Sequence, residues 1–256
     1  MPQQILELPA PPPDVRISYG ESPFQFGHLR LPKNAGPHPV AIVLHGGFWR
    51  AAYDLLHIGH LCHALRDSGC ATWSLEYRRL GNPGGGYPGT LDDVLAGAAY
   101  LGRIAAGHSL DLRRVVVAGH SAGGHLALYA GIRKPLPLRG VVALAPVADL
   151  RRAFELRLSN NVTRDLLGGS PGEVPGRYRA ASPSEMLPAR LPARLLHGIS
   201  DTVVPIDLSR RYETAPLALG DDCRLIPIPG AGHFELIDPR TKPFSVVRET
   251  LIDLLA

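Results

Sequence analysis

Short apolar runs alternate with longer segments of helical periodicity along most of the chain. The runs have the length and the β-branched content of strands. They lie at residues 15–19, 24–31, 40–44, 71–76, 115–118, 141–145, 193–196 and 224–228. From the third run onward the residues are continuously apolar, which is typical of strands that are buried on both faces of a parallel sheet.

Segments with helical periodicity fill the gaps between these runs. The helices that we expect lie at residues 55–68, 90–106, 122–131, 206–218 and 244–255. Alternation of strand and helix predicts an α/β fold with a mostly parallel sheet, helices on both faces and right-handed crossovers. The first two runs are joined by a short turn, so we expect them to form an antiparallel hairpin at one edge of the sheet.

No internal repeat and no interdomain linker interrupts this pattern, so the sequence predicts a single domain over residues 1–256. The prolines of residues 1–14 predict an extended arm. Residues 149–192 are polar, rich in arginine and punctuated by glycines and prolines. We expect this segment to form a small lid above the strand tips rather than a second domain.

Composition and charge exclude several classes of partner. The net charge is +4 over 256 residues, and no run of five like charges occurs, so we expect no nucleic-acid partner. No apolar stretch approaches the roughly 20 residues that span a bilayer, and the N-terminus lacks the pattern of a signal peptide. The 3 cysteines lack metal or redox spacing. These features predict a reducing, cytoplasmic setting without a membrane partner.

The most informative stretch runs from Gly119 to Gly123, with the pattern Gly-x-Ser-x-Gly between a strand and a helix. A sharp strand-to-helix turn forces its central residue into a strained conformation, which only small neighbours tolerate. Ser121 would then project from the sheet at a helix N-terminus, where backbone N–H groups favour developing negative charge. A capping turn without chemistry is the alternative, and the context favours a nucleophile.

A serine nucleophile needs a base, and the base needs a carboxylate to orient it. His233 follows the last expected strand on a glycine-rich loop, on the same edge of the sheet as Ser121. Asp201 follows the preceding strand, so the chain order is serine, aspartate, histidine, as expected for an α/β-hydrolase. Asp149, past the strand before, is the rival acid.

The stretch "HGGFWR" after the third run predicts an oxyanion-binding loop. Glycines let the main chain approach a substrate without a Cβ atom in the way. One N–H donor for the oxyanion is expected from Ala122, and the second from Gly47 or Phe48. We also expect side chains or backbone around these turns to contact the substrate, namely those of Gly46, Phe48, Trp49, His120 and Tyr87.

Together the HGGFW loop, the GHSAGG turn, Asp201 in its HGISD context and His233 resemble the α/β-hydrolase superfamily. The closest resemblance is to the esterase/lipase branch with an HGG-x-W loop, which includes arylformamidases and carboxylesterases. The likeness extends from about Val40 to the C-terminus. It implies an eight-stranded, mostly parallel sheet, a Ser–His–Asp triad and no cofactor. The hormone-sensitive-lipase branch carries a third glycine where this chain has Phe48, which weakens any transfer of lipase specificity.

Two other sequence patterns could indicate a different chemistry, namely a metal site and a phosphate loop. His57, His60 and His63 recur every third residue, but this step turns around a helix by about 60° each time, so compact metal ligation is awkward and we expect no metal site. The triple glycine before Tyr87 lacks the lysine that follows a phosphate loop. Glu76, Arg78 and Arg79 are expected to form a structural ion-pair cluster.

These residues predict a serine hydrolase that cleaves carboxylic esters with small or medium acyl groups. An arylformamidase or other C–N hydrolase is the alternative that the same triad could serve, and a peptidase is less favoured. A non-catalytic binding protein on the same fold is the alternative from another class. The sequence leaves the oligomeric state open, with a homodimer among the options.

Overall fold

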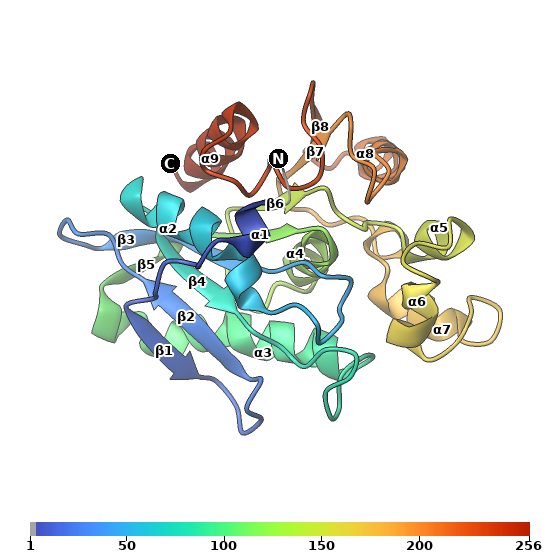
Figure 1. Ribbon diagram of the computed structural model, residues 1–256, viewed down its shortest axis with the longest axis horizontal. Helices are drawn as coiled ribbons and strands as arrows, with labels where there is room; N and C mark the ends of the chain where they lie inside the picture. Colours follow the sequence, from blue (N-terminus) through green and yellow to red (C-terminus); the bar gives the residue numbers. More distant parts are fainter. Residues whose placement is uncertain (1–3) are drawn as a thin grey trace.

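The computed structural model describes residues 4–256, and its centre is one eight-stranded sheet (Figure 1). The strand order is β1-β2-β4-β3-β5-β6-β7-β8. β1 pairs antiparallel with β2, and β2 pairs antiparallel with β4, whereas β3 to β8 all pair in parallel. The bounds are β1 Val15–Ser18, β2 Phe26–Arg30, β3 His38–Leu44, β4 Ala71–Leu75, β5 Leu110–His120, β6 Gly140–Leu144, β7 Ala193–Gly198 and β8 Cys223–Ile228.

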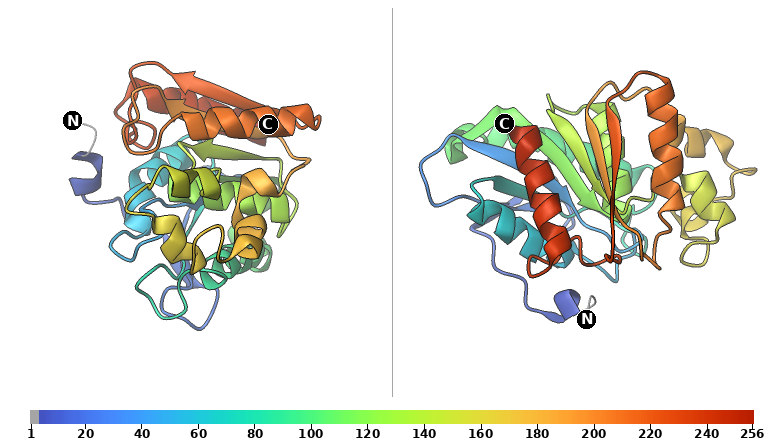
Figure 2. Two further views of the ribbon diagram at one scale, coloured as in Figure 1. Left: turned by 90° about the vertical axis from the view of Figure 1, so that its right-hand side faces the viewer. Right: turned by 90° about the horizontal axis from the view of Figure 1, so that it is seen from above.

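Helices cover both faces of this sheet (Figure 2). Leu61 and Leu65 of α2 share an apolar cluster on one face with Val247 and Leu251 of α9. Residues of α3, α4 and α8 belong to the larger cluster on the opposite face. The bounds are α2 Gly59–Asp67, α3 Gly89–Ile104, α4 Ala122–Arg133, α8 Asp207–Ala218 and α9 Lys242–Leu255, with short 3₁₀ turns η1 Leu55–Ile58 and η2 Ala106–His108.

This architecture confirms the α/β fold, the eight strands and the edge hairpin that the sequence predicts. β5 begins at Leu110, five residues before the apolar run that marks it. Its first residues are polar, and Asp111 there pairs with Arg113 and Arg114 through 3.2 and 2.9 Å contacts. A strand end that is stabilised by side-chain ion pairs carries no apolar signal, so the sequence pattern does not reveal it.

The excursion between β6 and β7 folds into three short helices and a 3₁₀ turn, which lie on the right of Figure 1. They are α5 Leu150–Glu155, α6 Val162–Leu167, α7 Pro175–Ala181 and η3 Pro183–Glu185. Leu150, Leu166 and Tyr178 are buried and belong to the larger core cluster. This excursion therefore packs on the domain through apolar contacts.

One helical turn interrupts the N-terminal arm, which its prolines predict to be extended, while the proline stretch at residues 9–13 contains no helix. Residues 1–3 of the arm lie outside the described residues, and Gln4–Glu7 form the single helical turn α1. Ile5 is only 3% exposed, in the core cluster that includes α2 and α9. Farther along, the fully buried Arg30 donates to the carbonyl of Pro11 at 2.8 Å. The arm is therefore attached to the domain at two places.

The turn between β5 and α4 allows no side chain at its glycines. Ser121 has φ 59° and ψ −118°, a strained conformation for a non-glycine residue. A Cβ atom on Gly119 would lie 2.1 Å from the carbonyl oxygen of Gly123. A Cβ atom on Gly123 would lie 2.1 Å from the carbonyl oxygen of Leu44, at the end of β3. Because these two positions carry no side chain, α4 begins in direct contact with the central strands.

We predict that Gly123→Ala lowers the free energy of unfolding by about 2–4 kcal/mol, because the clash involves backbone atoms that cannot rotate away. Gly102→Ala in α3 is the matched control, since nothing lies within 4 Å of its Cβ position. There alanine should raise stability by about 0.5–1 kcal/mol through its helix preference. Urea unfolding followed by circular dichroism measures both variants. Equal stability of the two proteins would contradict the close approach.

Candidate active site

Ser121 stands where β5 passes into α4 and is 2% exposed. Its main chain is held on both sides: its N–H donates to the carbonyl of Leu144 at 2.7 Å, and its carbonyl accepts from His125 at 3.2 Å. The N–H of Ala122 belongs to the first turn of the twelve-residue helix α4. The positive end of the helix dipole therefore lies beside the serine hydroxyl.

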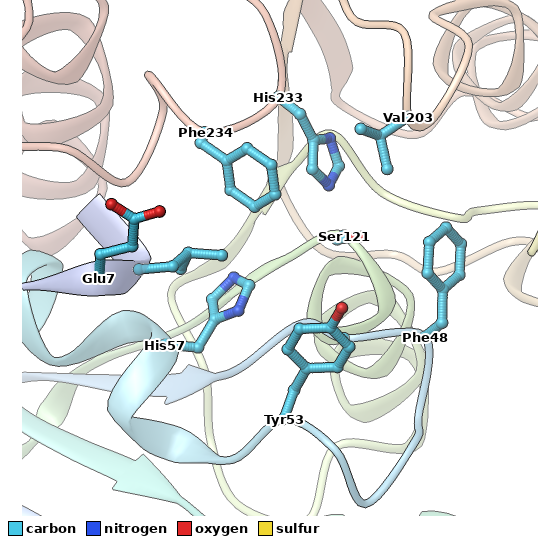
Figure 3. A pocket seen from close by; sticks show the side chains of 10 residues that line it. Glu7, Phe48, Tyr53, His57, Ser121, Val203, His233 and Phe234 are labelled. Carbon is cyan, nitrogen blue, oxygen red and sulfur yellow. The ribbon is translucent and has the colours of Figure 1, made fainter. Parts of the chain in front are cut away.

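His233 and Asp201 form a short, directed hydrogen bond. The Nδ1 atom of His233 lies 2.6 Å from Oδ2 of Asp201. A carboxylate only accepts, so Nδ1 carries a proton, and in the neutral ring Nε2 is then the nitrogen with the lone pair. The other oxygen of Asp201 accepts from the backbone N–H groups of Val203 at 2.8 Å and Val204 at 2.9 Å. In Figure 3 the ring of His233 points into the cavity toward Ser121.

The surroundings of Asp201 keep it ionised. Burial alone would raise the pKa of this carboxyl, but hydrogen bonds from His197 and His233, the charge of His233 and the N–H of Val204 outweigh it and lower the pKa. A carboxylate in this state can hold an imidazole in one tautomer and stabilise the imidazolium.

The loop after β3 runs against Ser121 in a strained conformation. Gly47, Phe48 and Trp49 have φ values of 103°, 50° and 56°, three left-handed residues in succession. A Cβ atom on Gly46 would lie 3.1 Å from the Cβ atom of Ser121. Such strain persists only where the surrounding structure enforces it, and it clusters at functional sites.

Buried hydrogen bonds of His45 hold this loop in place. His45 contacts the carbonyl of Gly46 through Nδ1 at 2.8 Å and Oε1 of Glu76 through Nε2 at 3.0 Å. Burial would raise the pKa of Glu76, but the charge and hydrogen bond of His45 and the charge of Arg79 lower it. Glu76 pairs with Arg79 at 3.3 Å, whereas Arg78 pairs with Asp93 at 2.6 Å, so the expected cluster of Glu76, Arg78 and Arg79 is confirmed in part.

Two further histidines, His120 and His57, support the main chain of His233. The Nε2 atom of His120 donates to the carbonyl of His233 at 2.9 Å, so its Nδ1 atom is an acceptor. His57 therefore donates from Nε2 to that Nδ1 atom at 3.0 Å. Burial, followed by the charges of His45 and His233, lowers the pKa of His57 to about 3. Both histidines are neutral at physiological pH.

A cavity of about 420 Å³ opens above Ser121 (Figure 3). It brings together Ser121, His233, Gly47 and Phe48, all of which the sequence predicts as site residues. The pattern did not identify the remaining lining residues, which are Leu6, Glu7, Tyr53, His57, Val203 and Phe234. Tyr53, Val203 and Phe234 follow a predicted site residue within four positions, and proximity in sequence is the signal that could have found them. None of the lining residues comes from residues 149–192.

Four residues expected to contact substrate lie outside this cavity. Trp49 is fully buried and packs edge-on against His125, with ring centroids 5.2 Å apart. Gly46 and His120 are buried behind the cavity wall, where they contact main chain. Tyr87 is held beneath the excursion, because its N–H donates to the carbonyl of Leu166 at 2.7 Å. None of these four residues is among those that line the cavity, so their contact with substrate stays a prediction.

The rival acid and the histidine repeat have structural roles. Asp149 caps α5 by accepting from the N–H of Arg152 at 2.9 Å. Among residues 4–256, no group of three or more His, Cys, Asp or Glu side chains could hold a metal ion. Nor does any helix in the described part of the chain have the length and apolar character to cross a membrane.

Comparison with known structures assigns the fold to a class. The chain superposes on a truncated carbohydrate esterase from gut microbiota with a TM-score of 0.82, at 21% identity, over 96% of this chain and 98% of the other. A propionate-bound esterase of Thermogutta terrifontis superposes with a TM-score of 0.76, at 20% identity, over 94% and 93% of the two chains. The architecture is that of an α/β-hydrolase.

Sequence comparison identifies the family. Residues 28–215 match the profile of the BD-FAE family, so the chain belongs to that family. It is also 26% identical to Esterase LipC of Mycobacterium tuberculosis (strain ATCC 25618 / H37Rv) over 250 residues. That match covers 89% of this chain and 62% of LipC, so this chain spans less than two thirds of its relative.

The neutral state of His57 has a measurable consequence for stability. Its folded pKa is about 3, against 6.5 for the free side chain, so below pH 6.5 the unfolded chain takes up a proton that the folded chain refuses. The contribution of His57 to the free energy of unfolding is fully present above pH 6.5 and is lost as the pH falls toward 3. This contribution falls by at most about 1.4 kcal/mol per pH unit.

We predict that His57→Gln makes the free energy of unfolding less dependent on pH, by about 1 kcal/mol per pH unit between pH 6 and 5. Glutamine does not titrate, and its amide can still donate to His120. Urea unfolding at several pH values measures the slope for both proteins. Parallel curves for the wild type and the variant would show that His57 is not held neutral in the folded chain.

Proposed function

We propose that this protein is a carboxylesterase-type serine hydrolase that acts on carboxylic esters with small or medium acyl groups. The observation that carries the proposal is the meeting of Ser121 and His233 in one cavity, with Asp201 fixing His233 through a 2.6 Å hydrogen bond. A nucleophile, a base with a free lone pair and an orienting carboxylate are the parts that acyl transfer to serine requires.

In the proposed reaction the Oγ atom of Ser121 attacks the ester carbonyl while Nε2 of His233 takes the hydroxyl proton. The tetrahedral intermediate then breaks its bond to the alcohol oxygen, which receives this proton from His233. Water attacks the resulting acyl-enzyme in the same way, with His233 again as base, and the acid and free Ser121 are released. Asp201 stabilises the imidazolium in both halves and stays ionised.

We assign the oxyanion donors to the N–H groups of Ala122 and Gly47. The carbonyl of Gly46 is held by the ring of His45 at 2.8 Å. In a trans peptide the N–H points away from the C=O, so the N–H of Gly47 faces away from His45. This geometry favours Gly47 over Phe48 as the second donor. Each such donor contributes roughly 3–4 kcal/mol to stabilising the transition state.

The size of the cavity and its aromatic walls support small or medium acyl groups. Its volume is about 420 Å³, and Phe48 stands on one side of Ser121 (Figure 3). The propionate in the esterase of Thermogutta terrifontis and the name of Esterase LipC agree with such a substrate. We propose a small-molecule ester as the partner and no cofactor.

The remaining proposals concern organisation and setting. We propose that residues 1–256 act as one domain, in which residues 149–192 form a small cap that packs on the core without lining the cavity. Cys62, Cys70 and Cys223 are free and buried, which supports a reducing, cytoplasmic setting.

We predict that an active-site-directed fluorophosphonate labels the wild-type protein on Ser121 and that Ser121→Ala abolishes the labelling. The probe reacts only with a hydroxyl that an adjacent base activates. Mass spectrometry of the labelled peptide locates the adduct, and hydrolysis of p-nitrophenyl acetate should be lost in the same variant. Folded wild-type protein that takes no label would instead indicate a binding protein that retains the fold.

We predict that Asp201→Asn lowers kcat for the same ester by about 10³–10⁴-fold with little change in KM, since asparagine stabilises the wrong tautomer of His233. The nearby Asp207→Asn, at the start of α8, is the matched control and should leave kcat unchanged. Steady-state kinetics at pH 8 separates the two variants. If both retain wild-type kcat, Asp201 is not the acid of the triad.

A further inference from the structure

The N-terminal arm contributes one wall of the catalytic cavity. Leu6 and Glu7 line it, although they lie more than a hundred residues before Ser121 in the sequence. Burial of Ile5 in the core anchors the helical turn that carries them, and the bond from Arg30 to Pro11 anchors the rest of the arm. Glu7 itself is exposed, so its carboxylate stands in water at the mouth.

Glu7 sets the formal charge of this cavity. Among the described residues that line it, Glu7 is the one Asp, Glu, Lys or Arg side chain. The carboxylate of Asp201 lies behind His233, and the hydrogen bonds that it accepts stabilise its charge. His57 adds no positive charge, because burial lowers its pKa to about 3. A ligand in the cavity therefore experiences one carboxylate and no fixed cation on its walls.

Aromatic rings surround the path from Ser121 to this carboxylate. Phe48, Tyr53 and Phe234 all line the cavity. In Figure 3 Phe234 and His57 lie between Ser121 and Glu7, while Phe48 stands on the opposite side of the serine. Aromatic faces combined with a carboxylate are the groups that bind alkylammonium ions, since the ring quadrupole and the negative charge both attract a cation.

The direction of this path identifies the part of the substrate that reaches Glu7. His233 delivers its proton to the leaving alcohol in the proposed reaction, so the alcohol must lie on the His233 side of the carbonyl. Phe234 follows His233 directly, and their rings meet edge to face with centroids 5.1 Å apart. The alcohol group therefore extends past Phe234 toward Glu7, and the acyl group extends toward Phe48.

We propose that this site prefers esters whose alcohol portion carries an alkylammonium cation, with the cation between Phe234 and the carboxylate of Glu7. This specificity rests on the proposed esterase activity and adds a substrate class to it. Glu7 is then a specificity-determining residue that the N-terminal arm supplies. The arm acts as part of the binding site rather than as a simple extension of the chain.

The experiment compares two esters of the same shape, acetylcholine and 3,3-dimethylbutyl acetate, which differ by the charge of one atom. For the wild-type protein at low ionic strength we expect kcat/KM to be about three- to tenfold higher for the cationic ester. In Glu7→Gln this ratio should fall to about one. Glu21→Gln, which removes an exposed glutamate in the turn between β1 and β2, is the matched control and should keep the wild-type ratio.

Ionic strength provides a second measurement on the unmutated protein. Because Glu7 is exposed, raising the salt concentration from 20 mM to 500 mM should reduce the wild-type ratio toward one, through screening. A wild-type ratio of one or less at low salt overturns the cation preference and leaves the esterase proposal standing. A high ratio that persists in Glu7→Gln also overturns the role of Glu7. Wild-type protein that hydrolyses neither ester overturns both proposals.

Discussion

The contact between the backbone of α4 and the end of β3 is the constraint on which this structure depends. Gly123 lies so close to Leu44 that a methyl group would overlap the strand's carbonyl oxygen. The same approach brings the loop from His45 to Trp49 beside Ser121. Two segments that are distant in sequence thus form one surface of N–H groups and a hydroxyl. Because the contact is between main-chain atoms, it is rigid, and the other parts of the site are arranged around it.

Buried histidines maintain the geometry that this contact creates. His45 contacts the carboxylate of Glu76, whereas His120 and His57 are neutral and donate in one direction toward the carbonyl of His233. One support therefore includes an ionised carboxylate and the other consists of neutral rings, and together they hold the two sides of the cavity. The free energy of the fold and the position of the catalytic groups are coupled through them.

The sequence predicted the sheet, and it pointed to Ser121, Asp201 and His233 as site residues, because both depend on local patterns. Continuous apolar runs identify buried strands, and Ser121, Asp201 and His233 each follow such a strand. It did not distinguish Phe48 from Trp49, since the left-handed backbone of both residues decides that one faces the cavity and the other the core. Nor could it place Glu7, because only the anchoring of Ile5 and Pro11 brings the arm to the site. Long-range packing of this kind leaves no periodic signal.

The arm shows how a scaffold shared across a superfamily can acquire a specificity of its own. The proposed triad and its amides are positioned by the sheet, so in this proposal their chemistry is the same for every ester that reaches them. The groups beyond Phe234 come from a segment that precedes the sheet and contacts it at few points. A change at Glu7 can therefore alter the charge of the mouth without disturbing the strained turn at Ser121. The net charge of the chain is +4, so the net charge of the molecule does not attract a cationic substrate. Preference for such a substrate must then arise at short range, from the rings and the carboxylate that it touches.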